Sequence, residues 1–315
     1  MSVSRAELDR RLEELRSEIS DPRAGIHGPN SFAWQIGKES ILFLGGGKAA
    51  LLQLAHPFVA HAIDQHSSAR TDPLGRFQRT FDAVFRMVFG DFEQAERAAR
   101  RVHALHSRVT GPIAEDIGRF SRDQPYSAND EQALLWVHAT LVETAVQVYD
   151  LLVRPLDDAE RDRYYQDSKR FAKLFGIPER ITPPDWPAFL EYYRSMLDSD
   201  VIRVGGPARE LARFLFAAPH TMQRPLFGWL EIMTAGLLPE RLRREFGFDF
   251  GSLERAVYRS SVLAISASYR HLPSRLREAP AYTKACRRLA GKSGPDRFAE
   301  LRQRAMLAAL GARRM

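Results

Sequence analysis

Apolar residues recur with a helical period of about 3.6 residues over most of this 315-residue chain. In the segment 4–20, for example, Leu8, Leu12 and Leu15 mark one face among charged residues. Strand patterns are scarce, since the short β-branched run 201–204 is the only candidate strand and loops flank it. The pattern therefore predicts an all-α fold.

Proline, glycine and capping residues divide this pattern into successive helices. Asp72 and Pro73 open one helix that Gly90 closes, and Asp91 opens the next. We expect helices over 4–20, 34–44, 48–54, 57–66, 73–90, 91–109, 131–152, 157–174, 186–197, 208–216, 227–235, 239–246, 253–269, 281–289 and 295–310. They predict one globular multi-helix domain over 31–275, preceded by a helix and loop over 1–30 and followed by a basic helical tail over 276–315.

Composition places the chain among ordinary globular proteins, with 44% hydrophobic and 27% charged residues. The lone cysteine, Cys286, excludes an internal disulfide and a zinc–cysteine site, and it fits a reducing compartment. Neither a secretory apolar stretch nor a clean run of about 18 apolar residues is present. We therefore expect a cytoplasmic protein with no transmembrane helix.

Positive charge gathers toward the end of the chain, where residues 270–315 contain twelve Lys/Arg and three acidic residues. A basic tail can contact nucleic acid or an anionic membrane. A solvated helical tail is the simpler interpretation. We expect no nucleic-acid partner, and a peripheral membrane contact through the tail stays open.

Histidine is the first candidate for chemistry, because six of the nine histidines lie between His56 and His138. His56, His61 and His66 are spaced by five, which turns about 140° around a helix, so they cannot share one face. Capping or hydrogen bonding is the favoured role of these three. The remaining histidines of the segment are His103 and His106, which share a face, and His138, which lies among apolar residues.

A polar patch is predicted on the helix over 73–90. Arg76, Arg79 and Thr80 stand at i, i+3 and i+4 and therefore lie on one face. Two guanidinium groups and a hydroxyl suit a carboxylate, a phosphate or a bound oxygen species. A surface salt-bridge patch with Asp72 and Asp82 is an equally good interpretation.

The segment Gly45-Gly46-Gly47-Lys48 resembles a phosphate-binding loop at first sight. It lacks the GxxxxGK[ST] spacing, and a helix rather than a strand precedes it. A tight helix junction with close backbone approach is the favoured interpretation. No GxSxG, HExxH, CxxC or dinucleotide fingerprint occurs, which excludes several common enzyme classes.

Five segments in order carry a family resemblance: LGGGKAALLQLAHPFVAHAIDQHS, DPLGRFQRT, VFG, HALHSRVTG and LLWVHATLVET. Together they resemble the MpaB/rubber-oxygenase catalytic domain family, which includes the latex-clearing proteins. The resemblance covers about residues 31–275. It implies an all-α fold with a buried haem pocket and one haem b.

The resemblance also implies roles for particular residues. The family's proximal histidine corresponds best to His106, with His103 one turn away as the competitor. The family's distal patch corresponds to Arg76 and Thr80. Latex-clearing proteins have a lysine just before the threonine, where this chain has Arg79, and arginine does not lose its proton to ligate iron. The glutamate that they carry upstream has no counterpart here, so polyisoprene cleavage is not expected.

The leading hypothesis is a haem-dependent oxygenase or related oxidoreductase that uses O₂ or peroxide on a small or lipid-like apolar substrate. His106 would hold the iron, and Arg76, Arg79 and Thr80 would act at the reacting side. His138 or His103 would support the cofactor. Two alternatives stay open: a non-haem metal enzyme built on His61, His103, His106 and His138, and a non-catalytic helical protein that binds through its basic tail.

Overall fold

The computed structural model describes residues 1–67, 73–292, 294, 296, 298 and 301–302. Within the fifth helix the side chains of a few residues also lie outside the description, namely Pro73, Leu74, Arg76, Phe77 and Gln78. The expected helix over 295–310 and the residue Asp72 lie largely or wholly outside the described residues.

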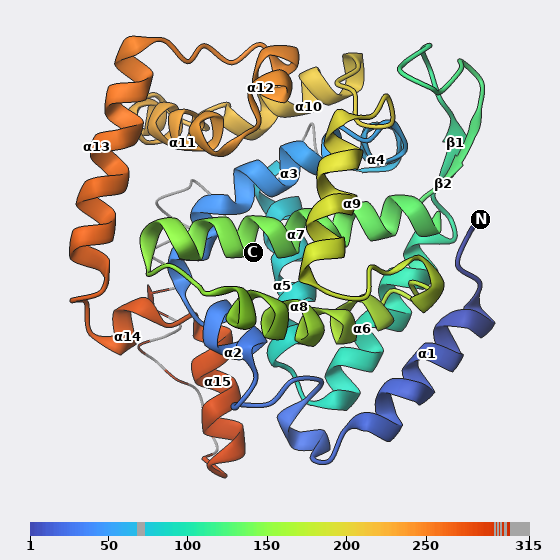
Figure 1. Cartoon of the computed structure of the whole chain (residues 1–315), viewed down its shortest axis with the longest axis vertical. Coiled ribbons are helices and arrows are strands. Elements are labelled where there is room, and N and C mark those ends of the chain that lie inside the picture. Colours follow the sequence, from blue (N-terminus) through green and yellow to red (C-terminus); the bar gives the residue numbers. More distant parts are fainter. Residues whose placement is uncertain (68–72, 293, 295, 297, 299–300, 303–315) are drawn as a thin grey trace.

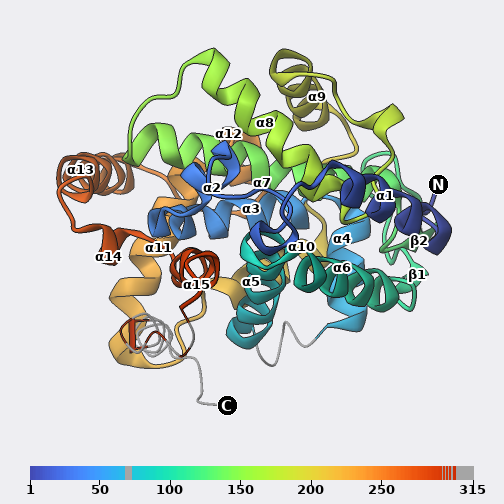
Figure 2. The same ribbon diagram turned by 90° about the horizontal axis from the view of Figure 1, so that it is seen from below.

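Helix α7 (Glu131–Leu152) runs through the middle of the molecule, with other helices on both sides of it (Figures 1 and 2). Asp130 caps its N-terminus by accepting from the backbone N–H groups of Gln132 and Ala133. Fourteen of its residues are buried, from Glu131 to Leu152, so both sides of this helix contribute to the core. The fold is therefore all-α, built around one central helix.

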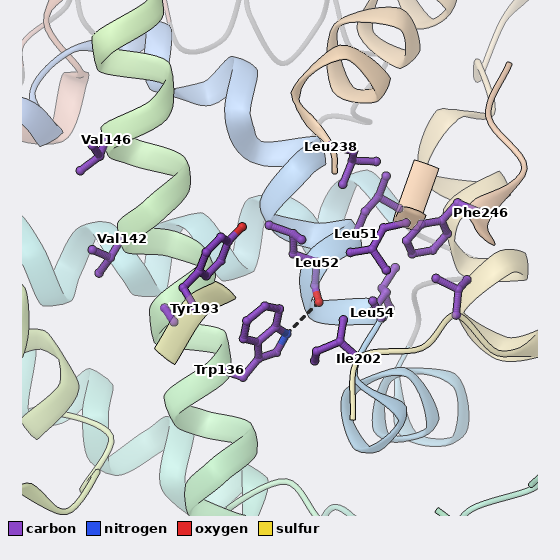
Figure 3. Packing of buried hydrophobic residues seen from close by; sticks show 14 of the residues in the cluster. Leu51, Leu52, Leu54, Trp136, Val142, Val146, Tyr193, Ile202, Leu238 and Phe246 are labelled. Atoms are coloured by element: carbon purple, nitrogen blue, oxygen red, sulfur yellow. Dashed lines mark hydrogen bonds between the residues drawn. The ribbon is translucent and has the colours of Figure 1, made fainter. Parts of the chain in front are cut away.

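Trp136 of α7 is fully buried and fixes the packing of α7 against α3 (Gly46–Leu54). Its indole Nε1–H donates to the carbonyl oxygen of Leu52 at 2.9 Å (Figure 3). Its ring stacks on Tyr193 of α9 (Trp186–Asp198), with 5.5 Å between the ring centroids. This core holds three helices that are distant in sequence in one arrangement.

The other described α-helices surround the core of α3, α7 and α9. In the order of the sequence they are α1 (Arg5–Glu18), α2 (Phe32–Gly37), α4 (Pro57–His66), α5 (Pro73–Phe89), α6 (Phe92–His106), α8 (Asp158–Lys173), α10 (Gly206–Phe216), α11 (Arg224–Leu237), α12 (Glu240–Phe246), α13 (Ser252–Tyr269), α14 (Ser274–Arg277) and α15 (Pro280–Leu289). Five of them begin at a residue whose side chain accepts a hydrogen bond from the first turn, namely α1, α2, α4, α6 and α8.

Four short 3₁₀ segments and one antiparallel strand pair complete the described secondary structure. The 3₁₀ segments are η1 (Pro22–Ala24), η2 (Ser40–Gly45), η4 (Glu179–Ile181) and η5 (Thr221–Gln223). The strands β1 (Thr110–Pro112) and β2 (Pro125–Ser127) pair Thr110 with Ser127 and Gly111 with Tyr126. This pair was not expected from the sequence, because three-residue strands give no alternating pattern.

The β-branched run 201–204, the one candidate strand in the sequence, does not form a strand. Ile202 and Val204 are buried without strand pairing, and the backbone N–H of Arg203 donates to the Ala55 carbonyl at 2.7 Å. The β-branched pattern therefore reflects burial in the core rather than strand pairing.

The expected helix over 34–44 is interrupted. It forms as α2 and η2, separated by Lys38 and Glu39. The Tyr269 hydroxyl donates to Glu39 Oε2 at 2.9 Å and accepts from the Ile41 N–H at 3.3 Å. The Ala279 N–H donates to the Lys38 carbonyl at 2.6 Å. Contacts from the distant C-terminal part therefore replace helical hydrogen bonds at this break.

Among the described residues, no helix has the length and apolar character that crossing a membrane requires.

Candidate functional site

Helices α5 and α6 form the framework that carries most of the candidate residues. They are joined at Gly90 and Asp91, and the Asp91 side chain accepts from the Gln94 N–H at 2.7 Å, so it starts α6. The two helices leave this junction at an angle to each other (Figures 1 and 2). The N-terminal half of α5 and the C-terminal end of α6 are therefore the two ends remote from the junction.

The polar patch lies on α5, at the end remote from that junction. Arg79 and Thr80 are consecutive residues of α5 and are exposed. Arg76 belongs to the same helix, but its side chain lies outside the described part. Asp82 is half-buried, and burial raises its carboxyl pKa while Arg86 opposes that shift. The structure thus presents Arg79 and Thr80 outward on one arm of the α5–α6 pair.

The residues of α5 after Thr80 include a row of aromatic side chains. Phe81 and Phe85 contact Phe43 of η2, with ring centroids 5.0 and 5.4 Å apart. Phe89 continues the row onto Trp34 and Tyr282, at 5.5 and 5.9 Å. These contacts hold α5 against α2 and α15, so the polar patch stands on a helix with a fixed packing face.

His106 is the last residue of α6 and is half-buried. The backbone N–H of Val109 donates to its carbonyl at 3.0 Å, which continues the turn into the loop before β1. The exposed Leu105 precedes it, at 62% relative exposure. The His106 side chain therefore lies at the end of the helix and is only partly exposed.

His103 shares the face of His106 but is committed to a structural contact. It is buried, and its Nε2–H donates to the Val3 carbonyl oxygen at 3.1 Å. The carbonyl can only accept, so this nitrogen carries the proton. His103 therefore attaches the end of α6 to the first residues of the chain.

Asn129, in the turn before α7, stabilises the same C-terminal end of α6. It is buried, and its Nδ2 donates to the His103 carbonyl at 3.3 Å and to Ser107 Oγ at 3.1 Å. These two acceptors flank His106 along the chain. The amide thus satisfies a helix-terminal carbonyl and fixes the residues on both sides of His106.

The strand pair anchors the loop that follows His106. His66 Nε2–H donates to the Thr110 carbonyl at 2.9 Å, and Gln65 Nε2 donates to the Pro112 carbonyl at 3.0 Å. The Tyr126 hydroxyl donates in turn to Gln65 Oε1 at 2.8 Å. The end of α4 is therefore attached to β1, one short loop beyond His106.

His138 lies on α7 and faces α8. It is buried, its Nε2–H donates to the Ser168 carbonyl at 3.0 Å, and its ring stacks on Phe171 at 6.3 Å. Burial lowers its pKa to about 4, and the Ser168 contact opposes the shift. The expected partner of this buried histidine is thus a backbone carbonyl on α8, and the ring is neutral at pH 7.

The three evenly spaced histidines take separate structural roles, as the spacing predicts. His56 caps α4 by accepting from the Phe58 N–H at 3.2 Å, and burial lowers its pKa to about 4. His61 Nδ1–H donates to the Pro57 carbonyl at 2.8 Å. The Nε2 of His61 then carries a lone pair and is buried without a hydrogen-bond partner.

The glycine-rich segment forms the tight helix junction that its spacing predicts. A side chain at Gly45 would collide with Thr144 and Val148, and one at Gly47 would collide with Thr234. Lys48 is 1% exposed, and its Nζ donates to Glu143 Oε2 at 2.5 Å and Gln147 Oε1 at 2.6 Å. Burial lowers the Lys48 pKa while Glu143 opposes the shift.

No group of three His, Cys, Asp or Glu side chains with metal-site geometry occurs within the described ranges. In particular, the structure shows His103 and His138 committed to backbone carbonyls on different elements. The four-histidine arrangement considered from the sequence is not assembled among these residues.

Sequence reasoning did not identify Asn129 or the Lys48–Glu143 pair. Asn129 stands in the turn before α7, where asparagine is common for local reasons, so its long-range contact with α6 leaves no signal. Glu143 interrupts the apolar pattern of 131–152, and that interruption was the available signal for a buried partner.

Comparisons with known proteins match most of the chain to a family model. Residues 33–267 match the family model described as "ER-bound oxygenase mpaB/B'/Rubber oxygenase, catalytic domain". An uncharacterized protein of Mycobacterium tuberculosis is 40% identical over 169 residues, which is 52% of this chain and 62% of that protein. An uncharacterized protein of Mycobacterium bovis matches with the same values. The matched segment thus covers less than two thirds of these relatives, and no solved structure matches the chain.

Proposed function

Because the chain belongs to the mpaB/rubber-oxygenase catalytic domain family, we propose that it is a haem b-dependent oxygenase or related oxidoreductase. The proposed substrate is a small or lipid-like apolar molecule, with O₂ or peroxide as the oxidant. The observation that carries the proposal is the placement of His106 at the braced end of α6, with the Arg79–Thr80 patch on the adjoining helix α5.

In this proposal an iron porphyrin has one protein ligand, and His103 and His106 are the candidates on α6. His106 is half-buried at a helix end, whereas His103 donates its Nε2–H to Val3, so His106 is the better ligand. Haem, when bound, supplies an iron centre that reacts with O₂ or peroxide. Asn129 holds the residues on both sides of His106 and thus fixes the backbone that carries the imidazole.

The cationic side chains of α5 provide the polar side of the proposed site. Arginine keeps its charge at every physiological pH and offers several N–H donors. Arg76 and Arg79 would bind the acidic groups of the cofactor or a developing negative charge. The Thr80 hydroxyl both donates and accepts, so it can hold a proton near the reacting oxygen. In these roles arginine keeps its proton, whereas a lysine at position 79 could lose its proton and ligate iron.

An absorption spectrum of the purified chain, expressed with haem supplied, tests this proposal. We expect a strong Soret band that shifts on dithionite reduction, and its loss in His106→Ala. His66→Ala is the matched control, because His66 also lies at a helix end and contacts a backbone carbonyl. A chain that folds and takes up no haem, or a His106→Ala variant with an unchanged spectrum, contradicts the proposal.

A further inference from the structure

Helix α13 lies at the outer edge of the molecule, on the side opposite α6 and the β1–β2 pair (Figures 1 and 2). Of its 18 residues, only Tyr269 is buried. Its inner side packs on α11 and α7, where Trp229 Nε1 donates to Ser261 Oγ at 2.9 Å and Val262 and Ile265 reach the core. The helix is therefore fixed from one side and open on the other.

The open face of α13 carries exposed apolar residues, with the exposed Ser260 among them. Leu253 and Leu263 are each 69% exposed, and Ala256, Ala264 and Ala267 are exposed between and beside them. At 100° per residue these five positions fall within one third of the helix circumference. Beyond the end of α13, Leu272 and Leu276 are 41% and 44% exposed. Exposed leucines on one face of a surface helix can mark a binding surface.

Positive charge borders the exposed apolar residues of α13. Arg255 and Arg259 on α13 and Arg270 just after it are exposed, and none of the three forms a salt bridge within the described part of the chain. Glu254 is the only acidic residue between Ser252 and Arg277, and its carboxylate accepts from the Gly251 N–H at the helix start. The face thus carries exposed leucines and arginines without matching anions.

The exposed leucines and arginines together distinguish two possible binding partners of the α13 face, a second copy of this chain and an anionic lipid surface. A second copy of α13 would bring arginines against arginines, which costs electrostatic energy. An anionic lipid surface supplies both missing elements, a negative headgroup layer for the arginines and an apolar layer for the leucines. We propose that the α13 face, with the start of α14, docks on anionic lipid bilayers.

Vesicle co-sedimentation of the full chain tests the docking directly and does not depend on haem or activity. We expect binding to vesicles of equal parts phosphatidylcholine and phosphatidylglycerol, with little binding to phosphatidylcholine alone. Arg259→Glu with Arg270→Glu should weaken binding at least about tenfold, because each cation near such a surface contributes about 1 kcal/mol. Leu263→Glu should weaken it by a similar factor, because it removes apolar insertion.

Matched variants on the opposite side separate this face from general charge attraction. Arg119→Glu with Arg122→Glu changes net charge equally in the exposed loop between β1 and β2, and Leu105→Glu alters a 62% exposed leucine of α6. Both controls should bind vesicles within about twofold of the parent chain. Thermal unfolding of every variant verifies that it is folded.

Three results would overturn the proposal. The first is no binding to anionic vesicles at low salt, and the second is equal loss of binding in the α13 variants and the controls. The third is a dimer in light scattering that Leu263→Glu dissolves while vesicle binding is absent, which would make a second copy the occupant.

Discussion

The Nε2–H of His103 donates to the carbonyl oxygen of Val3 at 3.1 Å, and thereby joins the end of α6 to the start of the chain. His106, one turn later, is the half-buried last residue of α6. The two histidines on one helix face thus have separate roles: His103 holds the helix end, and we propose that His106 binds the cofactor.

The first prediction follows from this division. His103→Ala should lower the free energy of unfolding by about 2–4 kcal/mol, because it removes a buried ring and leaves the Val3 carbonyl without its donor. His106→Ala should cost less than about 1 kcal/mol, because its ring is half-buried. Urea unfolding of both apoproteins provides the measurement. A larger loss in His106→Ala than in His103→Ala would be inconsistent with the assigned roles.

Asn129 should matter for stability although it lies in the turn before a helix. Asn129→Ala removes two hydrogen bonds from a buried amide and leaves the Ser107 hydroxyl and the His103 carbonyl less satisfied. We expect a loss of about 1–3 kcal/mol. A double-mutant cycle with Ser107→Ala should show coupling of at least about 0.5 kcal/mol. Strictly additive losses would mean that the Asn129–Ser107 contact contributes nothing.

Stability should fall between pH 6.5 and pH 4, and His138 should account for part of that loss. Burial lowers its folded-state pKa from 6.5 to about 4. A depressed histidine pKa means that the unfolded chain takes up the proton first, so stability is full above pH 6.5 and declines through pH 4. The contribution is on the order of 3 kcal/mol for a shift of this size.

The matched variant for this pH effect is His138→Gln, which keeps a donor for the Ser168 carbonyl but does not titrate. Urea unfolding at pH 7 and pH 4.5 should show a smaller difference in this variant than in the parent chain. His220→Gln, which alters an exposed histidine, should retain the parent difference. If His138→Gln keeps the full difference, the titrating groups lie elsewhere.

Removal of one member of the Lys48–Glu143 pair should lower the free energy of unfolding strongly, whereas replacement of both members by apolar residues should lower it little. Lys48→Met leaves Glu143, whose side chain is only 17% exposed, without its cation, so we expect a loss of about 3 kcal/mol. Lys48→Met with Glu143→Met should recover most of that loss, because two apolar side chains need no charge partner. Urea unfolding distinguishes the cases, and a double variant less stable than the single variant would exclude this account.

Helices were predictable wherever local signals set them. The predicted range 131–152 coincides with α7, and the capping roles of Asp91 and Asp157 follow from residue types at helix starts. The break at Lys38–Glu39 was not predictable, because its causes are Tyr269 and Ala279, far along the chain. Local periodicity carries no information on such partners.

The candidate site was predictable in its parts but not in its arrangement. Spacing placed His103 and His106 on one face, and only the structure shows that His103 is committed to Val3. The same holds for His138, whose burial was expected and whose partner, the Ser168 carbonyl, depends on the packing of α8. Which nitrogen remains available is a property of tertiary contacts.

The interruption at Lys38–Glu39 also constrains how the chain acquires its shape during synthesis. The Glu39 carboxylate receives the hydroxyl of Tyr269 across a sequence separation of 230 residues, and the adjoining Lys38 carbonyl receives the Ala279 N–H. On the ribosome, the Glu39 carboxylate, the Ile41 N–H and the Lys38 carbonyl therefore lack these partners until almost the whole described chain has emerged. Contacts between residues so far apart in sequence form late, because the loop between them must close first, so the structure at this break is completed at a late stage of folding.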